Sequence, residues 1–362
     1  MKGRVLVAGF ATRHIAQSAH AAGYEVYAVD HFCDQDLGFY TRESRSFDEL
    51  GELEGAVVEM CEQIRPDLVI AASGGELLGT GDLCGTPPGK VERFLDKVST
   101  HQFFEELGIP TPGLLAPGMY PAMVKPRKGS GGWRNAIVHD DAEFLAWSEK
   151  FGDLPHLTEE VVPGVPSSVC CLGTGSSAIA VAVNRQILRG TNEAAYGFSG
   201  SVTPFQGDAA PIMVQYAERI ASASGCMGTI GIDFMAGDSV HAIEINPRFQ
   251  ATLDTIEMAT GINLFAAHVG AWQGGLSPKR RPRCRQVAVR KILFAERDME
   301  VSRNLLRFSP LIADIPWPGT SFEEGQAVVS MYGWGPGEGE AMALLDKHIR
   351  ILQQYMGGRL YG

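Results

Sequence analysis

The sequence predicts a protein of the α/β and α+β class that is built from several domains. Strand-like apolar runs alternate with helical segments over the first ninety residues, which is typical of a parallel sheet in an open α/β domain. Further along, strands and helices follow in a mixed order, and Gly237-Asp238 separates two strands as a hairpin turn does. A length of 362 residues is enough for two or three hydrophobic cores with clefts between them.

The N-terminal elements are predicted from their apolar runs and from the residues that end them. Ser46 and Glu49 have the spacing of a capping box, which places a helix start at Ser46. In chain order we expect a strand over 5–8, a helix ending near 23, a strand over 25–30, a helix over 46–64 and a strand over 68–72. Ligands bind such sheets at the carboxyl ends of the strands, here the loops 9–13, 30–36 and 73–76.

The remaining elements follow from the same signals. Residues 84–90, rich in Gly and Pro, are expected to form a boundary between domains, and a helix over about 99–107 ends at Gly108 and Pro110. We then expect a strand, a glycine-rich loop, a strand, a helix and a strand over 121–172, followed by a long strand, a polar loop, a helix at 212–224 and two strands up to 246. The tail from residue 286 is predicted as two strands and a helix over 338–356.

Composition excludes several classes of protein. With 45% hydrophobic residues the chain is not intrinsically disordered, and it has no run of eighteen apolar residues that could cross a bilayer. The apolar N-terminal segment is too short for a signal-peptide core, so we expect a cytoplasmic protein without a membrane partner. Seven cysteines without a Cys-x-x-Cys spacing indicate reduced thiols. A net charge of −11 argues against a nucleic-acid partner.

The segment 231–248, GIDFMAGDSVHAIEINPR, carries the clearest chemical signal. Side chains alternate along a strand, so Glu244, Asn246 and Arg248 share one face while the isoleucines between them point to the other. Asp233 is expected to project the same way from the partner strand. Two carboxylates and an amide oxygen suit Mg²⁺, and an arginine beside them suits a phosphoryl group. A surface hairpin is the alternative, but Asn-Pro-Arg after an alternating Glu is unusual for a plain strand.

A second candidate site begins at a strand end with Lys125. It continues through Arg127 and Lys128 into the loop Gly129-Ser130-Gly131-Gly132, whose backbone N–H groups could surround phosphates together with an ammonium group. An exposed mobile loop would explain the same residues. Lys97, which opens a helix after Asp96, would by itself be a solvated lysine.

A third candidate is the apolar and acidic strand 157–164, LTEEVVPG, which stops at Pro-Gly. It is either an edge strand or an inter-domain hinge whose backbone meets an adenine. The sequence of the strand does not decide between the two.

In this order, the segments resemble the ATP-grasp superfamily of carboxylate-activating ligases, in the branch related to biotin carboxylase. The resemblance rests on Lys97, Lys125 with its glycine loop, Glu159-Glu160-Val161-Val162, Asp233 and Glu244-x-Asn246-Pro247-Arg248. It implies an ATP-grasp fold in four parts. These are an N-terminal α/β pre-ATP-grasp domain over 1–90, a subdomain with the phosphate loop over 91–165, a subdomain with the Mg-binding hairpin over 166–275, and a C-terminal subdomain over 276–362 that completes the core.

The resemblance also implies an ATP- and Mg²⁺-dependent ligase, with Mn²⁺ as a substitute metal. It would join a carboxylate to an amine through an acyl phosphate, release ADP and phosphate, and act on an amino acid or a small coenzyme precursor. Two alternatives stay open: a carboxylase that acts through carboxyphosphate as biotin carboxylase does, and a non-catalytic ATP-binding regulatory protein. A homodimer stays open as well.

Each candidate residue receives a role from the resemblance. Lys125 and Arg248 are the implied catalytic residues, with Arg248 stabilising the transferring phosphoryl group. The implied metal ligands are Asp233, Glu244 and Asn246. The nucleotide would be bound by Lys97, Lys125, Lys128, Gly129, Ser130, Gly131, Gly132, Glu159, Glu160, Val161 and Val162.

Other parts of the site are less well defined by the sequence. After the hinge glycine Gly164, the chain lacks the acidic residue that family members commonly place for the ribose, and Arg185 or Arg189 would have to replace an additional phosphate-side lysine. We expect an acceptor pocket made by 73–76, 196–201 and Arg248, with Glu257 as a nearby carboxylate.

One local charge imbalance has two explanations. Residues 278–307 hold ten Lys/Arg against three Asp/Glu, a balance of +7. They form either a solvated or inter-domain basic face, which we favour, or a patch for an anionic substrate or nucleic acid.

Overall fold

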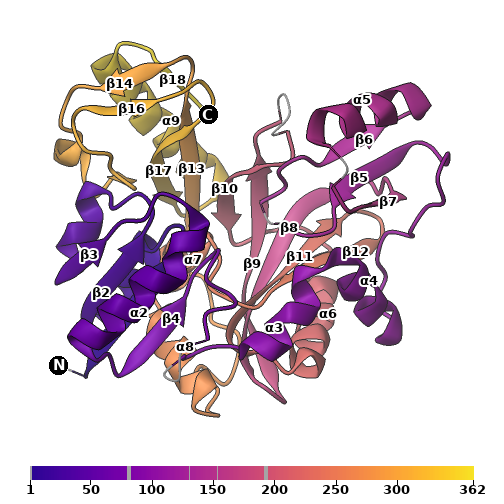
Figure 1. The fold of residues 1–362 in the computed structure, drawn as a ribbon, viewed down its shortest axis with the longest axis horizontal. Helices are drawn as coiled ribbons and strands as arrows, with labels where there is room; N and C mark the ends of the chain where they lie inside the picture. Colours follow the sequence, from indigo (N-terminus) through magenta and orange to yellow (C-terminus); the bar gives the residue numbers. More distant parts are fainter. Residues whose placement is uncertain (1, 80–82, 130, 153, 191–194) are drawn as a thin grey trace.

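A computed structural model of the chain describes residues 2–79, 83–129, 131–152, 154–190 and 195–362. In Figure 1 the N-terminal sheet lies beside the C-terminal strands, and a small sheet around β5 lies at the opposite end of the molecule. No helix in the described ranges combines the length and the apolar composition that a bilayer crossing requires. The seven cysteines are free thiols, as the composition predicted.

The N-terminal part is a parallel sheet with the strand order β3-β2-β1-β4. Its elements are β1 (Arg4–Gly9), α1 (Arg13–Ala21), β2 (Glu25–Asp30), β3 (Glu43–Arg45), α2 (Leu53–Ile64) and β4 (Leu68–Ala71). The central strand is apolar on both faces because each face is covered: Val5 and Val7 pack toward α1, and Leu6 and Ala8 pack toward α2. This part of the predicted fold class is confirmed.

The predicted start of the second helix is wrong. Residues 43–45 pair with β2, so the chain is still extended where the helix was expected to begin. The helix α2 starts at Leu53, after a 3₁₀ turn over Leu50–Glu52. Glu49 and Glu52 form the capping box instead. Phe47, which lies before this turn, packs into the core between the sheet and α2.

A small antiparallel sheet follows, with the order β6-β5-β7. Its elements are β5 (Ala122–Pro126), β6 (Ala136–Val138), α5 (Asp141–Phe151) and β7 (His156–Glu160), preceded by the helices α3 (Pro88–Leu95) and α4 (Lys97–Glu106). The predicted strand, loop, strand and helix are confirmed, but two strands follow the helix instead of one, β7 and then the strand that starts at Val165. The linker expected over 84–90 is shorter than predicted, because Pro88 already starts α3.

Within the described residues, the large sheet contains nine strands, and its main path runs β12-β11-β8-β9-β10-β13-β17-β15. Its strands are β8 (Val165–Thr174), β9 (Ala178–Leu188), β10 (Phe198–Thr203), β11 (Met227–Ala236), β12 (Val240–Asn246), β13 (Val287–Ala295), β15 (Ile312–Ala313), β17 (Ala327–Gly335) and β18 (Leu360–Tyr361). The prediction missed β10, whose sequence FSGSVT lacks an apolar run. A Cβ at Gly200 would lie 2.1 Å from the Arg290 carbonyl oxygen, so the small residue is needed for β10 to pair with β13.

Helices pack on both faces of the large sheet. They are α6 (Ala210–Ser224), α7 (Leu253–Thr260), α8 (Leu264–Trp272) and α9 (Glu338–Met356), and short strands β14 (Met299–Val301) and β16 (Thr320–Phe322) pair beside the C-terminal region. The predicted helices at 212–224 and 338–356 are confirmed, whereas α7 and α8 were not predicted. Apart from these, the structure has 3₁₀ turns over Gln35–Phe39 and Leu306–Phe308.

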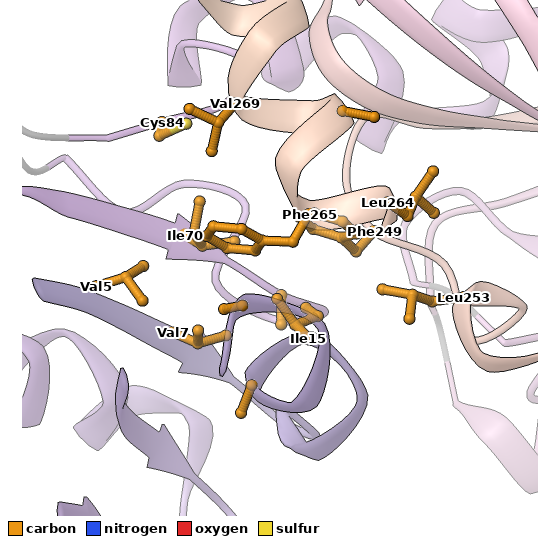
Figure 2. Packing of buried hydrophobic residues seen from close by; sticks show 14 of the residues in the cluster. Val5, Val7, Ile15, Ile70, Cys84, Phe249, Leu253, Leu264, Phe265 and Val269 are labelled. Carbon is orange, nitrogen blue, oxygen red and sulfur yellow. The ribbon is translucent and has the colours of Figure 1, made fainter. Parts of the chain in front are cut away.

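The N-terminal sheet is joined to the rest of the chain by a hydrophobic core. Figure 2 shows Val5, Val7 and Ile70 of the sheet beside Phe265 of α8. Phe265 stacks on Phe249 with 6.3 Å between ring centroids, and both side chains are almost fully buried. Burial of apolar surface contributes about 25 cal/mol per Å² to stability. The large Phe265 and Phe249 rings therefore stabilise the contact between the N-terminal sheet and the rest of the chain.

A buried charge cluster lies near this core. The Arg13 guanidinium, on α1, binds Asp254 on α7 at 2.7 Å and Asp314, just after β15, at 2.9 Å. Arg290 on β13 binds Asp314 at 2.8 Å, and the Tyr332 hydroxyl on β17 donates to Asp254 at 2.6 Å. Burial alone would raise the pKa of Asp254, but Arg13 and then Arg290 lower it to about 2, so the aspartate is ionised. The cluster therefore links α1, α7 and the C-terminal strands through charge.

We predict that Arg13→Met lowers the free energy of unfolding by about 3–5 kcal/mol, because it leaves buried carboxylates without their cation. Urea unfolding followed by circular dichroism measures this change. Arg45→Met is the matched control, since Arg45 pairs with Glu59 on the surface with both side chains about half exposed, and such pairs contribute about 0–1 kcal/mol. Equal losses in the two variants would contradict the role given to the cluster.

Candidate active site

A cavity of about 1020 Å³ lies where the small sheet, the large sheet and the N-terminal part meet. This volume is at the upper end of the range for small-molecule sites. In the described ranges, all residues predicted as catalytic, nucleotide-binding or metal-binding border the cavity: Lys97, Lys125, Lys128, Gly129, Gly131, Gly132, Glu159, Glu160, Val161, Val162, Asp233, Glu244, Asn246 and Arg248. Ser130, also predicted, lies outside the described residues.

The small sheet supplies a buried ion pair on one wall. Lys125 is at the end of β5 and Glu159 is on the adjacent strand β7, and the Lys125 ammonium donates to the Glu159 carboxylate. Both residues are more than nine-tenths buried. A buried ammonium needs a partner of opposite charge, and Glu159 supplies it. The prediction assigned Glu159 to nucleotide binding and did not anticipate that it pairs with Lys125.

The start of α4 is fixed to the loop that follows β5. Asp96 caps the helix by accepting from the Val98 amide at 2.9 Å, and it binds the Arg127 guanidinium at 2.5 Å. The Lys97 ammonium donates to the Gly129 carbonyl oxygen at 2.6 Å. Lys97 is therefore not a freely solvated side chain, because it is held at the edge of the glycine loop.

The glycine loop has a backbone conformation that residues with a side chain rarely adopt. Gly131 and Gly132 have φ angles of +76° and +72°. A Cβ at Gly132 would lie 2.1 Å from the Tyr196 carbonyl oxygen, so a side chain there would collide with the segment before β10. The loop thus approaches the opposite wall of the cavity closely with its main chain.

Asp233 on β11 and Glu244 on β12 are directly paired across the hairpin. The Asn246 amide donates to Asp233 at 3.2 Å, and the Gln186 amide, on β9, donates to the same carboxylate at 2.9 Å. Burial first, and the negative charge of Glu244 second, raise the pKa of Asp233 to about 7. The positive charge of Arg248 opposes this rise. Two carboxylates paired across a hairpin repel each other, so the donor set fits a divalent metal such as Mg²⁺.

The described residues contain no cluster of three or more His, Cys, Asp or Glu side chains that could hold a metal. The candidate set differs from such a cluster because its third member is the amide of Asn246. Mg²⁺ commonly takes only one or two carboxylates from a protein and completes its shell with phosphate oxygens and water.

One detail of the predicted hairpin is wrong. A bulge interrupts the pairing next to Asp233, so that Phe234 faces Ala242 and Ile243 is the extra residue. Ile243 consequently borders the cavity together with Glu244, whereas the strict alternation predicted opposite faces. Bulges re-aim side chains locally, and the sequence carries no separate signal for this one.

Arg248 connects the hairpin to the N-terminal part. Its guanidinium donates to Glu76 at 2.7 Å and to the Asn246 amide oxygen at 3.2 Å, and both ion-pair partners are mostly buried. Ser73 borders the same cavity, as do Tyr196 and Phe198. Members of each group expected around the acceptor pocket therefore border the cavity, whereas residues 74–76 and 199–201 are not among its lining residues.

Three expectations about supporting residues are wrong. Glu257 does not border the cavity; it accepts from the Ser18 hydroxyl and the Leu264 amide, both at 2.6 Å. Arg185 binds Glu338 at 2.5 Å, and Arg189 stacks on Phe294 with 3.9 Å between the guanidinium carbon and the ring centroid. Each of these side chains is already occupied in a contact away from the cavity.

Gln186 is a site residue that sequence reasoning missed. It lies on β9, a long strand in which Asn184 and Gln186 are spaced two residues apart and follow a run of apolar residues. This period of two could have indicated that polar side chains project from one face toward the hairpin. The glutamine itself carries no motif.

Known proteins are similar to this chain in sequence. The model of the ATP-grasp domain family matches residues 94–252. An uncharacterised protein of Methanocaldococcus jannaschii is 24% identical and covers 91% of this chain, which spans 87% of its length. The carbamoyl phosphate synthase large chain of Thermus thermophilus is 26% identical over 70% of this chain, but this chain spans only 28% of that protein.

Solved structures show the same fold at low identity. The biotin carboxylase domain of the 2-oxoglutarate carboxylase from Hydrogenobacter thermophilus, determined as a dimer with MgADP and bicarbonate, has a TM-score of 0.74 and 14% identity, with 92% of this chain and 86% of that chain covered. The L-amino acid ligase from Bacillus licheniformis has a TM-score of 0.73 and 15% identity, with 96% of both chains covered. Residues 94–252 therefore match the ATP-grasp domain family, and the chain shares the fold of these solved structures, as the resemblance of its motifs implied.

Proposed function

We propose that the protein is an ATP- and Mg²⁺-dependent ligase that joins a carboxylate to an amine through an acyl phosphate. The observation that carries the proposal is the meeting of three groups in one cavity: the lysines and glycine loop of the small sheet, the acidic hairpin, and Arg248. A carboxylate would attack the γ-phosphate of ATP, and the amine would then displace phosphate from the acyl phosphate. An amino acid or a small coenzyme precursor is the proposed substrate.

The residues would act mainly by position and charge. Lys97 and Lys125 would neutralise the phosphates, and the backbone of Gly131 and Gly132 would cover them and keep water out. Arg248 would stabilise the phosphoryl group in transfer. Asp233, Glu244 and Asn246 would hold the metal, which when bound supplies positive charge to the transferring phosphate.

Adenine binding is proposed for the strand end that leads out of the small sheet. Glu159 through Val162 border the cavity. The Glu160 amide already donates to the Gly113 carbonyl oxygen at 2.9 Å, and its carboxylate accepts from the Gly113 amide at 3.2 Å. Glu160 would therefore contribute position rather than its charge, and Val161 and Val162 would supply apolar contact to the base.

The domain organisation and the oligomeric state are also proposals. The division of the chain at residues 90, 165 and 275 is the domain organisation we propose, and a homodimer is the assembly we propose. A dimer of the related biotin carboxylase domain supports the second of these.

We predict that Glu244→Gln weakens the binding of the non-hydrolysable ATP analogue AMPPNP at least about tenfold in the presence of Mg²⁺, because one carboxylate ligand is lost. The affinity without Mg²⁺ should change little, and titration calorimetry measures both. Asp238→Asn is the matched control, since Asp238 is an exposed carboxylate in the turn of the same hairpin. Equal Mg²⁺ dependence in the wild type and Glu244→Gln would contradict the assigned metal site.

We also predict substrate-dependent release of ADP, with one amide formed per ADP, when pools of carboxylates and amines are screened by a coupled assay and mass spectrometry. Lys125→Met combined with Glu159→Gln should lower the rate at least about 100-fold, because the phosphate-side ammonium is lost while no buried carboxylate is left unpaired. Lys347→Met, an exposed lysine of α9, should leave the rate unchanged.

Other results of the screen would identify the alternatives. ADP release with bicarbonate alone would indicate a carboxylase that acts through carboxyphosphate. Binding of ATP with Mg²⁺ but no ADP from any pool would indicate a regulatory protein. The complete donor set of Asp233, Glu244 and Asn246 speaks against the regulatory protein, because a binding module without turnover does not require it.

A further inference from the structure

His14 is a buried histidine that borders the cavity and whose function is not explained by the fold. It lies in the first turn of α1, among the lining residues of the cavity, and is 9% exposed. In the part of the chain that the structure describes, no hydrogen bond reaches either ring nitrogen of His14. An unpartnered polar ring turned toward a ligand cavity is a candidate for contact with substrate.

Other buried histidines serve as internal comparisons. His268 uses both ring nitrogens, accepting from the Thr229 amide at 2.8 Å and contacting the Cys84 carbonyl oxygen at 3.0 Å. In His348, Nδ1 contacts the Tyr332 carbonyl oxygen at 2.8 Å. The rings of His268 and His348 link different parts of the fold by hydrogen bonds, whereas the His14 ring makes no such hydrogen bond to a described residue.

The charged groups around His14 favour its neutral form. Burial is the main cause that lowers the pKa of His14 to about 4; Asp254 on α7 opposes it, Arg13 on α1 and Arg290 on β13 add to it, and Asp314 after β15 opposes it. The start of a helix also disfavours a positive charge. A neutral imidazole has one nitrogen with a lone pair and can accept a hydrogen bond from an N–H group.

We propose that His14 contacts the acceptor amine and takes its proton as the amide forms. This inference rests on the proposed ligase function. Cationic groups elsewhere in the cavity suit the carboxylate and phosphates, while a neutral acceptor suits an N–H donor. As the amine nitrogen attacks the acyl carbon, the C–N bond forms and the C–O bond to phosphate breaks with its electron pair leaving on phosphate. The nitrogen proton passes to His14 and from there to solvent.

The position of His14 supports this assignment over one to the nucleotide. Ala11 borders the cavity from the loop after β1, and Ala251 and Thr252 border it from the segment before α7. Arg248 lies in the same cavity and would hold the acyl phosphate. The glycine loop is contributed by the small sheet, a different part of the chain. His14 is therefore presented by the N-terminal part, where the loops at the carboxyl ends of its strands lead toward a ligand.

The test separates the two half-reactions with hydroxylamine, a small nucleophile that gives a coloured hydroxamate from an acyl phosphate. With a carboxylate that supports ADP release, His14→Phe should lower kcat/KM for the amine about 100-fold, whereas the rate of hydroxamate formation at saturating hydroxylamine should stay within about twofold of the wild type. His14→Gln, which keeps a polar side chain, should lose less than His14→Phe. His20→Gln, an exposed histidine at the end of the same helix, should match the wild type in both assays.

Each outcome has a definite meaning. Equal losses in both assays would mean a structural role for His14, and unchanged amine kinetics in His14→Phe would overturn the inference while leaving the ligase intact. No hydroxamate and no ADP from the wild type with any carboxylate would overturn the proposed function and the inference together.

A second readout does not depend on turnover. In ¹⁵N spectra of the imidazole groups, assigned with His14→Gln, the His14 ring should remain neutral from pH 8 down to pH 5, because its folded-state pKa lies near 4. Protonation takes place only as the pH falls toward that value. Titration of His14 near pH 6.5 would contradict the neutral acceptor that the inference requires.

Discussion

Parts of the chain that are distant in sequence meet at one buried guanidinium, that of Arg13. It binds Asp254 and Asp314 within 2.9 Å, and Arg290 shares the second of these partners. Because buried charges are stable only when they are fully paired, the cluster allows little movement of α1 relative to α7 and the C-terminal strands. The loop after β1 and the segment before α7 both border the cavity, so the cluster also holds these two parts of the cavity wall in place.

Several lysine and arginine side chains line the cavity, although the whole chain has a net charge of −11. Three of these cations have an acidic partner in the structure: Lys125 has Glu159, Arg127 has Asp96, and Arg248 has Glu76. Pairing of this kind holds the side chains in place and limits their mutual repulsion. A bound triphosphate would then meet cations that are already positioned, which is how electrostatic catalysis avoids reorganisation during the reaction.

Much of the fold could be predicted because periodic apolar runs and Gly or Pro stops are local signals. The strand ends, the hairpin turn and the last helix were found in this way. The predicted residues that border the cavity came instead from strand alternation in the hairpin and from the resemblance to the ATP-grasp superfamily. The contacts that were missed depend on tertiary structure. Only pairing with β2 shows that the chain is still extended near Ser46, and only the packing of β13 explains why β10 needs Gly200.

Side-chain partners were the least predictable feature. The Glu257 carboxylate could in principle act as a base, yet it already accepts hydrogen bonds from the Ser18 hydroxyl and the Leu264 amide. The sequence places His14 beside Arg13 without indicating that one is fully paired and the other is not. Such differences follow from distances between elements, and a single sequence does not contain them.

Transfer of ¹⁸O from a labelled carboxylate shows whether an acyl phosphate forms. A carboxylate that supports ADP release is labelled with ¹⁸O in both oxygens, and the phosphate produced with the amine is analysed by mass spectrometry. An acyl phosphate passes one carboxylate oxygen to phosphate, so we expect one ¹⁸O in each phosphate released. Phosphate without ¹⁸O, formed together with ADP, would show that the carboxylate is not activated by phosphorylation and would contradict the ligase mechanism.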